Sequence, residues 1–435
     1  MVSVRIMNKY RPSKAKLARA IRRRLRQHLH TLGFIQHRSG LISPRSRTKD
    51  GYRALHRAQR TDRLRHDRKF VKENWPELKR FFADGNEVVP EKIEPLLDIV
   101  EAGTWKSRLF RLACLTWSVP VSQGYGRRIR FLVWDKSNQK LMGIIALGDP
   151  VFNLRVRDRF IGWSVRYRQS RLVNVLDAYV LGAIPPYNLL LGGKLVACLV
   201  RTQEVRDVFR RKYGGRKGLI SKRRKNPSLV AVTTTSALGP SAVFDRLKLG
   251  GVQYFKAIGF TDGWGHFHIP PDLFELTRQY LKLVHHRYAD GHQYGNGPNW
   301  KLRVVRQAFT MLKLNDNVLN HGIAREVFYC PLASNSVELL SKRDLREPRY
   351  ENLLKVSQVG KLAVDRWVVR RAASRDEYRQ WRVEGIAALV GAPRSSRRRV
   401  DKTPVSQIRN STPVWDMVNP PSLDGPGEVG VPAES

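Results

Sequence analysis

Cysteine is scarce in this sequence, and its scarcity excludes two kinds of architecture. Only three cysteines occur among 435 residues, and Cys114, Cys198 and Cys330 lie far apart. They provide neither a disulfide framework nor the Cys-x-x-Cys spacing of a zinc site. So few thiols are typical of proteins that work in a reducing cytosol.

Long apolar runs are also missing. The longest weakly charged stretch, Ala178–Gly193, is interrupted by Pro185 and Pro186 and is too short to span a bilayer. The first residues, MVSVRIMNKYRP, lack the apolar segment of a secretory signal peptide. We therefore expect a cytoplasmic protein that does not insert into a membrane.

Several motifs that mark catalysis are absent. The sequence contains no Gly-x-x-x-x-Gly-Lys-Ser/Thr loop for nucleotides, no His-Glu-x-x-His helix for zinc and no Gly-x-Ser-x-Gly turn for a serine nucleophile. Any ATPase or helicase activity is therefore expected from a partner protein.

Acidic residues are few compared with basic ones. The chain has 37 aspartates and glutamates against 80 lysines and arginines, and its formal net charge is +43. A hydrophobic content of 42% is enough to build folded cores, so the charge belongs to a folded protein. Such a surplus favours a polyanionic partner, and DNA is the partner we expect, because neutralised phosphates release condensed counterions. A membrane surface is the rival, but no amphipathic stretch carries the Trp and Phe anchors it would need.

The basic residues are concentrated at the N-terminus. Residues 1–80 hold 24 lysines and arginines against five acidic residues. Residues 1–83 are predicted to form a basic helical region, with a second helix over Arg53–Phe70. The first helix has one apolar stripe that repeats every four positions: Leu17, Ile21, Leu25 and Leu29. Three arginines are predicted to face away from this stripe and to contact phosphate, although a merely solvated face is the alternative: Arg22, Arg23 and Arg26.

Beyond this region the pattern changes from helical to mixed. Ile129, Phe131 and Val133 alternate with Arg130, Leu132 and Trp134. A turn follows at 135–138, and 141–147 is apolar throughout, which predicts a β-hairpin with a buried second strand. A further strand is expected at 183–191, and a helix at 194–213. The predicted fold is α+β, with a mixed, mainly antiparallel central sheet and flanking helices. The predicted regions after the first are a central domain at 84–340, a basic helical extension at 341–392 and a disordered tail at 393–435.

An ordered set of turn-rich and aromatic motifs carries a family resemblance. They read WSVP (117–120), GYGRR (124–128), ALGDPVFNL (146–154), RDRFIGW (157–163), DAYVLGAIPPYNLLLGGK (177–194), GFTDGWGHFHI (259–269) and HGIAREVFY (321–329). In this order they resemble the DruA family of Druantia antiphage defence systems over residues 15–335. The resemblance implies a role in defence or, because the family also occurs with transposases, in a mobile element. It assigns no catalytic residue.

The segment LLLGGK at 189–194 is weakly similar to the acetyltransferase core, in which a strand, a glycine-rich loop and a helix N-terminus hold the pyrophosphate of coenzyme A. Backbone N–H groups and the helix dipole favour an anion at such a position. A tight turn with a solvated Lys194 is the simpler interpretation. The sequence assigns no cofactor.

Three aspartates stand in apolar surroundings, namely Asp149, Asp158 and Asp177. A carboxylate in such a setting must be paired, hydrogen-bonded or shifted in pKa. They are candidates for a catalytic site, for example that of a metal-dependent nuclease, and structural ion pairs with arginine are the alternative. The loops that carry them are expected to converge on one face of the sheet, together with those at 124–128 and 259–268.

His266 and His268 flank one residue, so on a strand they would point to the same side and could ligate a metal. A packed or DNA-facing pair is the alternative. Further basic side chains beside turns and in the loop RKGLISKRRKN are predicted to bind nucleic acid: Arg127, Arg128, Lys194, Lys222, Arg223 and Arg224. The leading interpretation is a DNA-binding component that acts with other defence proteins, such as a helicase supplied in trans. An enzyme acting on nucleic acid, or an acyltransferase-like protein, is the alternative.

Overall fold

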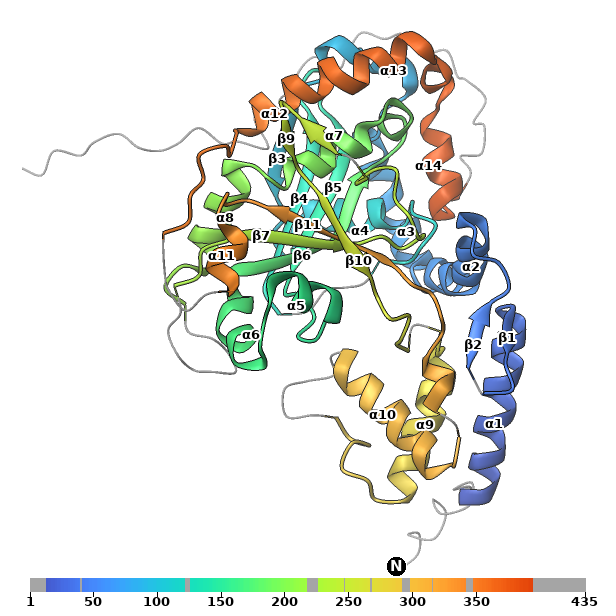
Figure 1. The fold of residues 1–435 in the computed structure, drawn as a ribbon. Coiled ribbons are helices and arrows are strands. Elements are labelled where there is room, and N and C mark those ends of the chain that lie inside the picture. The colour runs from blue at the N-terminus through green and yellow to red at the C-terminus, as the bar shows by residue number, and fades with distance from the viewer. Residues whose placement is uncertain are drawn as a thin grey trace, which may run out of the picture.

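The computed structural model describes residues 13–393, apart from residues 40, 122–125, 217–225, 246, 267, 292–297, 315 and 342–346. Its centre is a sheet with the strand order β10-β11-β7-β6-β5-β4-β3 (Figure 1). These strands are β3 (Pro95–Ile99), β4 (Arg128–Asp135), β5 (Lys140–Gly148), β6 (Val175–Ala183), β7 (Ala231–Thr235), β10 (Lys256–Phe260) and β11 (Glu326–Pro331). All neighbours are antiparallel except β6 and β7, which are parallel. The predicted α+β class is confirmed.

The hairpin of β4 and β5 shows why helices cover both faces of this sheet. Phe131 and Val133 of β4 belong to one apolar core, whereas Leu132 and Trp134 belong to another. The first core is completed by α7 (Gly192–Leu199), α8 (Gln203–Tyr213) and α12 (Val356–Ala363), and the second by α3 (Arg68–Leu78), α4 (Trp105–Cys114) and α14 (Val383–Val390). Alternate residues of a strand point to opposite faces, so a strand buried on both sides is apolar throughout.

A third core lies away from the sheet and forms a helical lobe, which we define as residues 13–44 and 268–320. It joins α1 (Lys14–Thr31) to α9 (Pro271–Leu283) and α10 (Pro298–Met311), below the sheet in Figure 1. The short hairpin of β1 (Phe34–Gln36) and β2 (Ile42–Pro44) follows α1. The predicted stripe of α1 is confirmed, because all four of its apolar residues are buried. Helix α1 begins after Ser13, whose hydroxyl accepts a hydrogen bond from the Lys16 amide.

Two predictions around residue 190 are wrong. Strand β6 ends at Ala183, and a short 3-10 helix (Tyr187–Leu190) replaces the strand expected at 183–191. Pro185 and Pro186 lack the N–H groups that a ladder needs. The helix expected at 194–213 is divided into α7 and α8, since the Thr202 hydroxyl donates to the Leu199 carbonyl and competes with helical hydrogen bonding.

The remaining elements connect these layers. Helix α2 (Lys49–His66) follows the lobe hairpin and leads into α3, while α5 (Arg155–Ile161), α6 (Val165–Arg171) and α11 (Ser336–Ser341) share a small core with β6, β7 and β11. The pair β8 (Lys248–Leu249) and β9 (Val252–Gln253) and helix α13 (Val369–Ser374) complete the described chain. The predicted tail at 393–435 falls almost entirely outside the described residues. Within the described ranges, no helix combines the length and the apolar character that crossing a bilayer requires.

Candidate functional site

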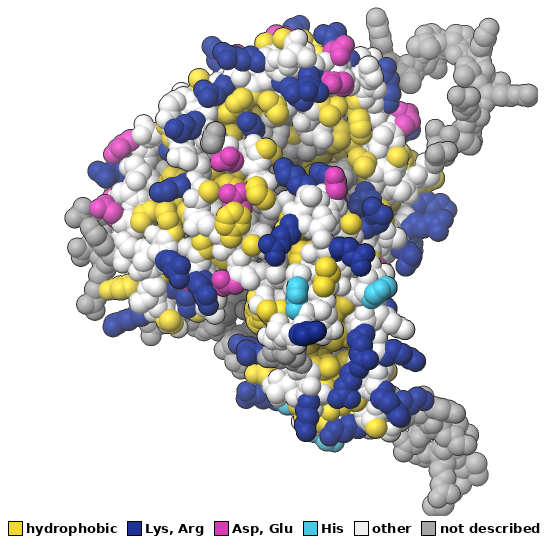
Figure 2. All heavy atoms as spheres, turned by 45° about the vertical axis from the view of Figure 1, so that its right-hand side comes forward, with side chains coloured by type: hydrophobic (Ala, Val, Ile, Leu, Met, Phe, Trp, Pro, Cys, Tyr) yellow, Lys and Arg dark blue, Asp and Glu magenta, His cyan; other side chains and the backbone are white. Residues whose placement is uncertain are grey.

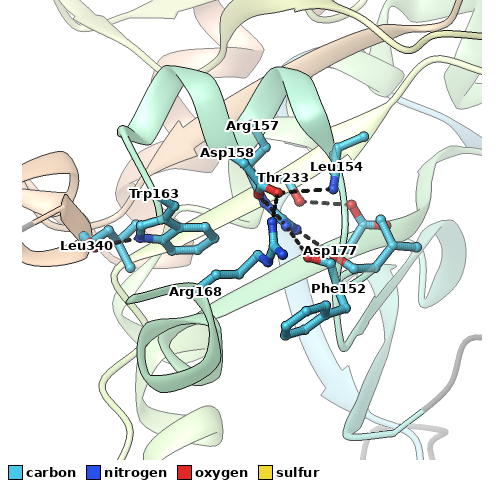
Figure 3. Close-up of polar contacts among 10 residues, drawn as sticks. Phe152, Leu154, Arg157, Asp158, Trp163, Arg168, Asp177, Thr233 and Leu340 are labelled. Carbon is cyan, nitrogen blue, oxygen red and sulfur yellow. Dashed lines mark hydrogen bonds and ion pairs between the residues drawn. The ribbon is translucent and has the colours of Figure 1, made fainter. Parts of the chain in front are cut away.

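Arg157 and Asp158 form the centre of a charged cluster at one end of the sheet (Figure 3). The Arg157 side chain is fully buried and donates from Nε and Nη2 to Asp158 Oδ1, at 2.9 and 2.6 Å. It also donates to the carbonyls of Val151 and Phe152, at 2.8 and 3.0 Å. Arg168 donates to the other Asp158 oxygen at 2.6 Å. Both carboxylate oxygens therefore have arginine partners, which compensates for burying the charge.

Asp177 lies beside this cluster on β6. The parallel register places it opposite Thr233 of β7, whose hydroxyl donates to Asp177 Oδ1 at 2.9 Å (Figure 3). Burial raises the pKa of Asp177 from 3.8 to about 6, although the Thr233 hydrogen bond and the Arg157 charge oppose the increase. Asp149 and Asp158 each form an ion pair with arginine, whereas the described residues include no arginine in direct contact with Asp177.

Asp149 is held by a different arginine. Its carboxylate accepts from Arg127 Nε at 2.7 Å and from the Arg127 amide at 2.9 Å, and Arg127 also donates to the Val173 carbonyl at 2.7 Å. Gly126 makes this approach possible, because it has φ +65° and a Cβ there would lie 2.0 Å from Asp149 Oδ2. Arg127 is therefore an internal brace, and only 17% of its side chain is exposed.

The three predicted aspartates do lie at the same end of the sheet. Gly148, which precedes Asp149, is paired with Asp177 across β5 and β6, and the Arg157 charge acts on Asp177. Lys194 lies beyond the opposite end of β6, with Nζ 5.7 Å from the Trp367 ring. It therefore does not join the three aspartates, although the loop that carries it was expected to converge with theirs. Among the residues that the structure describes, no group of three His, Cys, Asp or Glu side chains could hold a metal ion. The cluster thus has the geometry of structural ion pairs and offers no support for a metal-dependent nuclease.

The two candidate metal ligands, His266 and His268, are on a turn rather than on the expected strand. His268 is buried, and its Nε2 lies 2.9 Å from the Val318 carbonyl oxygen. Burial lowers the pKa of His266 to about 4 and that of His268 to about 3, so both rings are neutral at pH 7. The His268 ring lies 5.7 Å from that of His321, edge to face, which is the packing of a core.

The second candidate site is a basic surface on α1, the β1–β2 hairpin and α2, which we call the basic arm (residues 14–66). Its first acidic residue is Asp50. In Figure 2, lysine and arginine side chains gather over the lower part of the molecule, whereas carboxylates are interspersed with the cations of the upper part. The exposed cations of the arm run from α1 through the hairpin into α2: Lys14, Lys16, Arg19, Arg23, Arg26, Arg38, Arg45, Arg47, Lys49, Arg53, Arg57 and Arg65.

The three arginines predicted for α1 are not equivalent. Arg23 and Arg26 are exposed, as expected. Arg22 is half-buried instead, because its guanidinium donates to the Leu312 carbonyl at 2.7 Å, just after α10. Its neighbour Arg24 pairs with Asp272 in the first turn of α9 at 2.6 Å. These two side chains attach α1 to the rest of the lobe.

The other residues predicted to contact nucleic acid differ in their exposure. Arg128 is exposed, whereas Arg127 and Lys194 are partly buried against other side chains. Lys222, Arg223 and Arg224 lie outside the described residues. The hairpin cations Arg38, Arg45 and Arg47 were not singled out from the sequence, although the absence of acidic residues before Asp50 is a signal that could have found them.

Comparison with known proteins gives two matches. A family model described as "Druantia protein DruA" matches residues 46–342. A relative named Druantia protein DruA, from Escherichia coli (strain UMEA 4076-1), is 51% identical over 370 residues, which cover 85% of this chain and 91% of the relative. No solved structure matches significantly.

Proposed function

Because this chain belongs to the DruA family of Druantia antiphage defence proteins, we propose that it contributes to defence as a DNA-binding component and that the basic arm holds the DNA. The alternative setting, a mobile element, would use the same surface. In either setting the arm neutralises phosphates, and the sheet body provides the rigid support.

The observation that carries this proposal is the run of exposed cations on the arm. Arg19, Arg23 and Arg26 project from one helix, and no described carboxylate pairs with any of them. A cation without an internal partner gains most from a phosphate, since the counterions that DNA releases drive binding. The arm therefore provides a surface that reads charge and shape rather than base sequence.

Catalysis is assigned to partner proteins. The sequence has no nucleotide-binding loop, and the aspartates that could have served a nuclease are bound by Arg127, Arg157, Arg168 and Thr233. A helicase or nuclease supplied in trans would act on DNA that this chain holds. An acyltransferase-like activity has no observation in its favour.

The test compares two triple variants that each remove three exposed cations. R19Q/R23Q/R26Q changes the arm, and K361Q/R366Q/R370Q changes exposed cations of the helices above the sheet. Duplex DNA affinity is measured by anisotropy over a salt series. Wild-type affinity should fall about 10³- to 10⁵-fold between about 50 and 200 mM salt if six to ten phosphates are contacted. The arm variant should bind at least tenfold more weakly, and its log–log salt slope should shrink by about 0.9 for each phosphate that is no longer neutralised.

The control variant should bind like wild type, and both variants should unfold at the wild-type temperature because exposed substitutions change stability by only about 0.5 kcal/mol. Equal losses in both variants, or a flat salt response in wild type, would refute the arm as the binding surface. Parallel reactions with and without Mg²⁺ should leave the DNA intact, and Mg²⁺-dependent cleavage would restore the enzyme alternative.

A further inference from the structure

The segment that leaves β10 exposes two aromatic side chains. Phe260 is 51% exposed and Trp264 is 48% exposed. Of the exposed large hydrophobic side chains in the described ranges, only Phe152 is also aromatic. Aromatic rings of this size are usually buried, and those that stay exposed often belong to binding surfaces. We call Phe260 and Trp264 the aromatic pair.

The backbone beneath the aromatic pair is fixed. Trp264 forms an antiparallel bridge with Asn320, the Gly265 amide donates to the Leu319 carbonyl at 2.9 Å, and the Gly322 amide donates to the Gly263 carbonyl at 3.1 Å. Gly263 has φ +68°, and a Cβ there would lie 2.9 Å from the Ile323 amide nitrogen. The rings are therefore presented to solvent by an ordered segment, so little ordering entropy remains to be lost on binding.

The aromatic pair stands where the sheet body meets the helical lobe. Figure 1 shows the segment after β10 crossing from the sheet to α9. The segment it pairs with, residues 319–322, also touches the basic arm, because a Cβ on Gly322 would lie 3.2 Å from the Ile42 carbonyl oxygen of β2. Asn317 donates to the Ser39 carbonyl of the same hairpin at 2.7 Å. The pair and the arm hairpin thus belong to one continuous junction.

Cations flank the aromatic pair on its sheet side. Arg155 of α5 is 73% exposed and lies 3.6 Å from Asp262, which stands between the two aromatic residues. Val156 of the same helix would contact a Cβ at Gly259, so α5 is packed directly against the end of β10. Arg159 on α5 and Lys256 on β10 are also exposed. An aromatic surface edged by cations is complementary to a nucleic acid, which offers flat bases on a phosphate chain.

We propose that the aromatic pair stacks on unpaired bases of DNA held by the basic arm, so that this protein prefers single-stranded or locally melted DNA to intact duplex. The inference rests on the proposed DNA-binding function. In a duplex both faces of each base are already stacked, so an exposed ring has no base to cover without unpairing it. Unpaired bases are open, and every base has a face on which an aromatic ring can stack.

The experiment measures binding to oligothymidylate and to a duplex of equal length. Wild type should bind both forms, and the single strand more tightly than the duplex. F260A/W264A should lose about 5- to 150-fold in affinity for the single strand for each base no longer stacked, while its duplex affinity stays unchanged. W264F keeps a ring and should retain most of the single-strand affinity. L362A, which removes an exposed apolar side chain above the sheet, should change neither the single-strand affinity nor the duplex affinity. Tryptophan emission should be quenched by oligothymidylate in wild type, and the quenching should shrink in W264F.

The outcomes separate this inference from the proposed function. If wild type binds neither form of DNA, both fail. If wild type binds both forms of DNA and R19Q/R23Q/R26Q binds both more weakly, the basic arm is supported as the DNA-binding surface. If F260A/W264A then binds the single strand as tightly as wild type does, the stacking inference alone is overturned. An equal loss on duplex and single strand in F260A/W264A also overturns it, because the pair would then be a general contact. Loss of binding to a partner protein instead, with both DNA affinities unchanged, would assign the pair to a protein interface.

Discussion

The arginines of the basic arm and those of the sheet body differ in what surrounds them. Arg23 and Arg26 are exposed on a helix that has no acidic residue, whereas Arg157 is fully buried among oxygen acceptors. Arg127 is likewise bound to Asp149 and to backbone carbonyls. The same side chain therefore has two roles, and burial together with the available acceptors decides which role it has.

This difference changes how the net charge of +43 should be interpreted. Each arginine that braces a loop has already used its donors inside the protein, so it adds to the long-range field but cannot form a close contact with phosphate. A count of basic residues thus overestimates the DNA contacts of the body and is a better guide to those of the arm. The following substitutions test whether the bound arginines of the sheet body and the exposed arginines of the arm differ in their contribution to stability.

The largest expected effect comes from D158N in the body. The substitution leaves Arg157 buried without a full negative charge beside it, and breaking a buried pair in this way costs about 3–5 kcal/mol of unfolding free energy. Denaturant unfolding measures the loss. D262N is the matched control, since its partner Arg155 is exposed and such pairs contribute about 0–1 kcal/mol. Wild-type stability in D158N, with loss of a DNA-processing activity, would show that the carboxylate serves catalysis instead.

A smaller effect is expected from D177N, and it depends on pH. The pKa of Asp177 is raised from 3.8 to about 6 on folding, so between these values the folded protein binds more protons than the unfolded chain. Its contribution to stability therefore decreases as pH rises through this window. D177N removes the titration, and its stability relative to wild type should increase by about 2–3 kcal/mol between pH 4 and pH 7. Unfolding curves at the two pH values measure this difference, and a constant difference would show that Arg157 already balances the charge.

The smallest effects compare two neighbours on α1. R22Q loses the hydrogen bond to the Leu312 carbonyl and should cost about 1–2 kcal/mol. R24Q loses an exposed ion pair with Asp272 and should cost about 0.5 kcal/mol or less. Both variants lose one charge from the same helix, so thermal unfolding isolates the effect of partners from that of charge. Equal stabilities would place Arg22 with the exposed cations of the arm.

Local patterns in the sequence predicted the parts of the fold that depend on near neighbours. The stripe of α1 and the hairpin of β4 and β5 follow from periodicities of about four and two residues, and both are observed. The break between α7 and α8 was missed because it depends on the Thr202 side chain and on contacts of Arg201 with residues 331 and 352. Such contacts join positions that no local pattern relates.

For the two candidate sites, too, the sequence predicted which residues matter but not their partners in the fold. An apolar setting correctly singled out Asp158 and Asp177 as carboxylates that need partners, but only the fold shows that Arg168 and Thr233 provide them. Arg22 and Arg23 are adjacent and alike in sequence, and what distinguishes them is the Leu312 carbonyl, 290 residues away. The exposure of Trp264 could not be predicted either, because a lone tryptophan in a turn-rich segment is more often buried.

The core that α1 shares with residues 268–320 also determines when the helix can be completed during translation. Its apolar stripe leaves the ribosome well before its packing partners, which follow about 240–300 residues later. At about 5–20 residues per second this interval lasts about 12–60 s. During that time the nascent helix exposes both its apolar stripe and its cations, which are binding sites for a chaperone and for ribosomal RNA respectively. The proposed DNA-binding helix is thus made long before the segments that give it its native contacts.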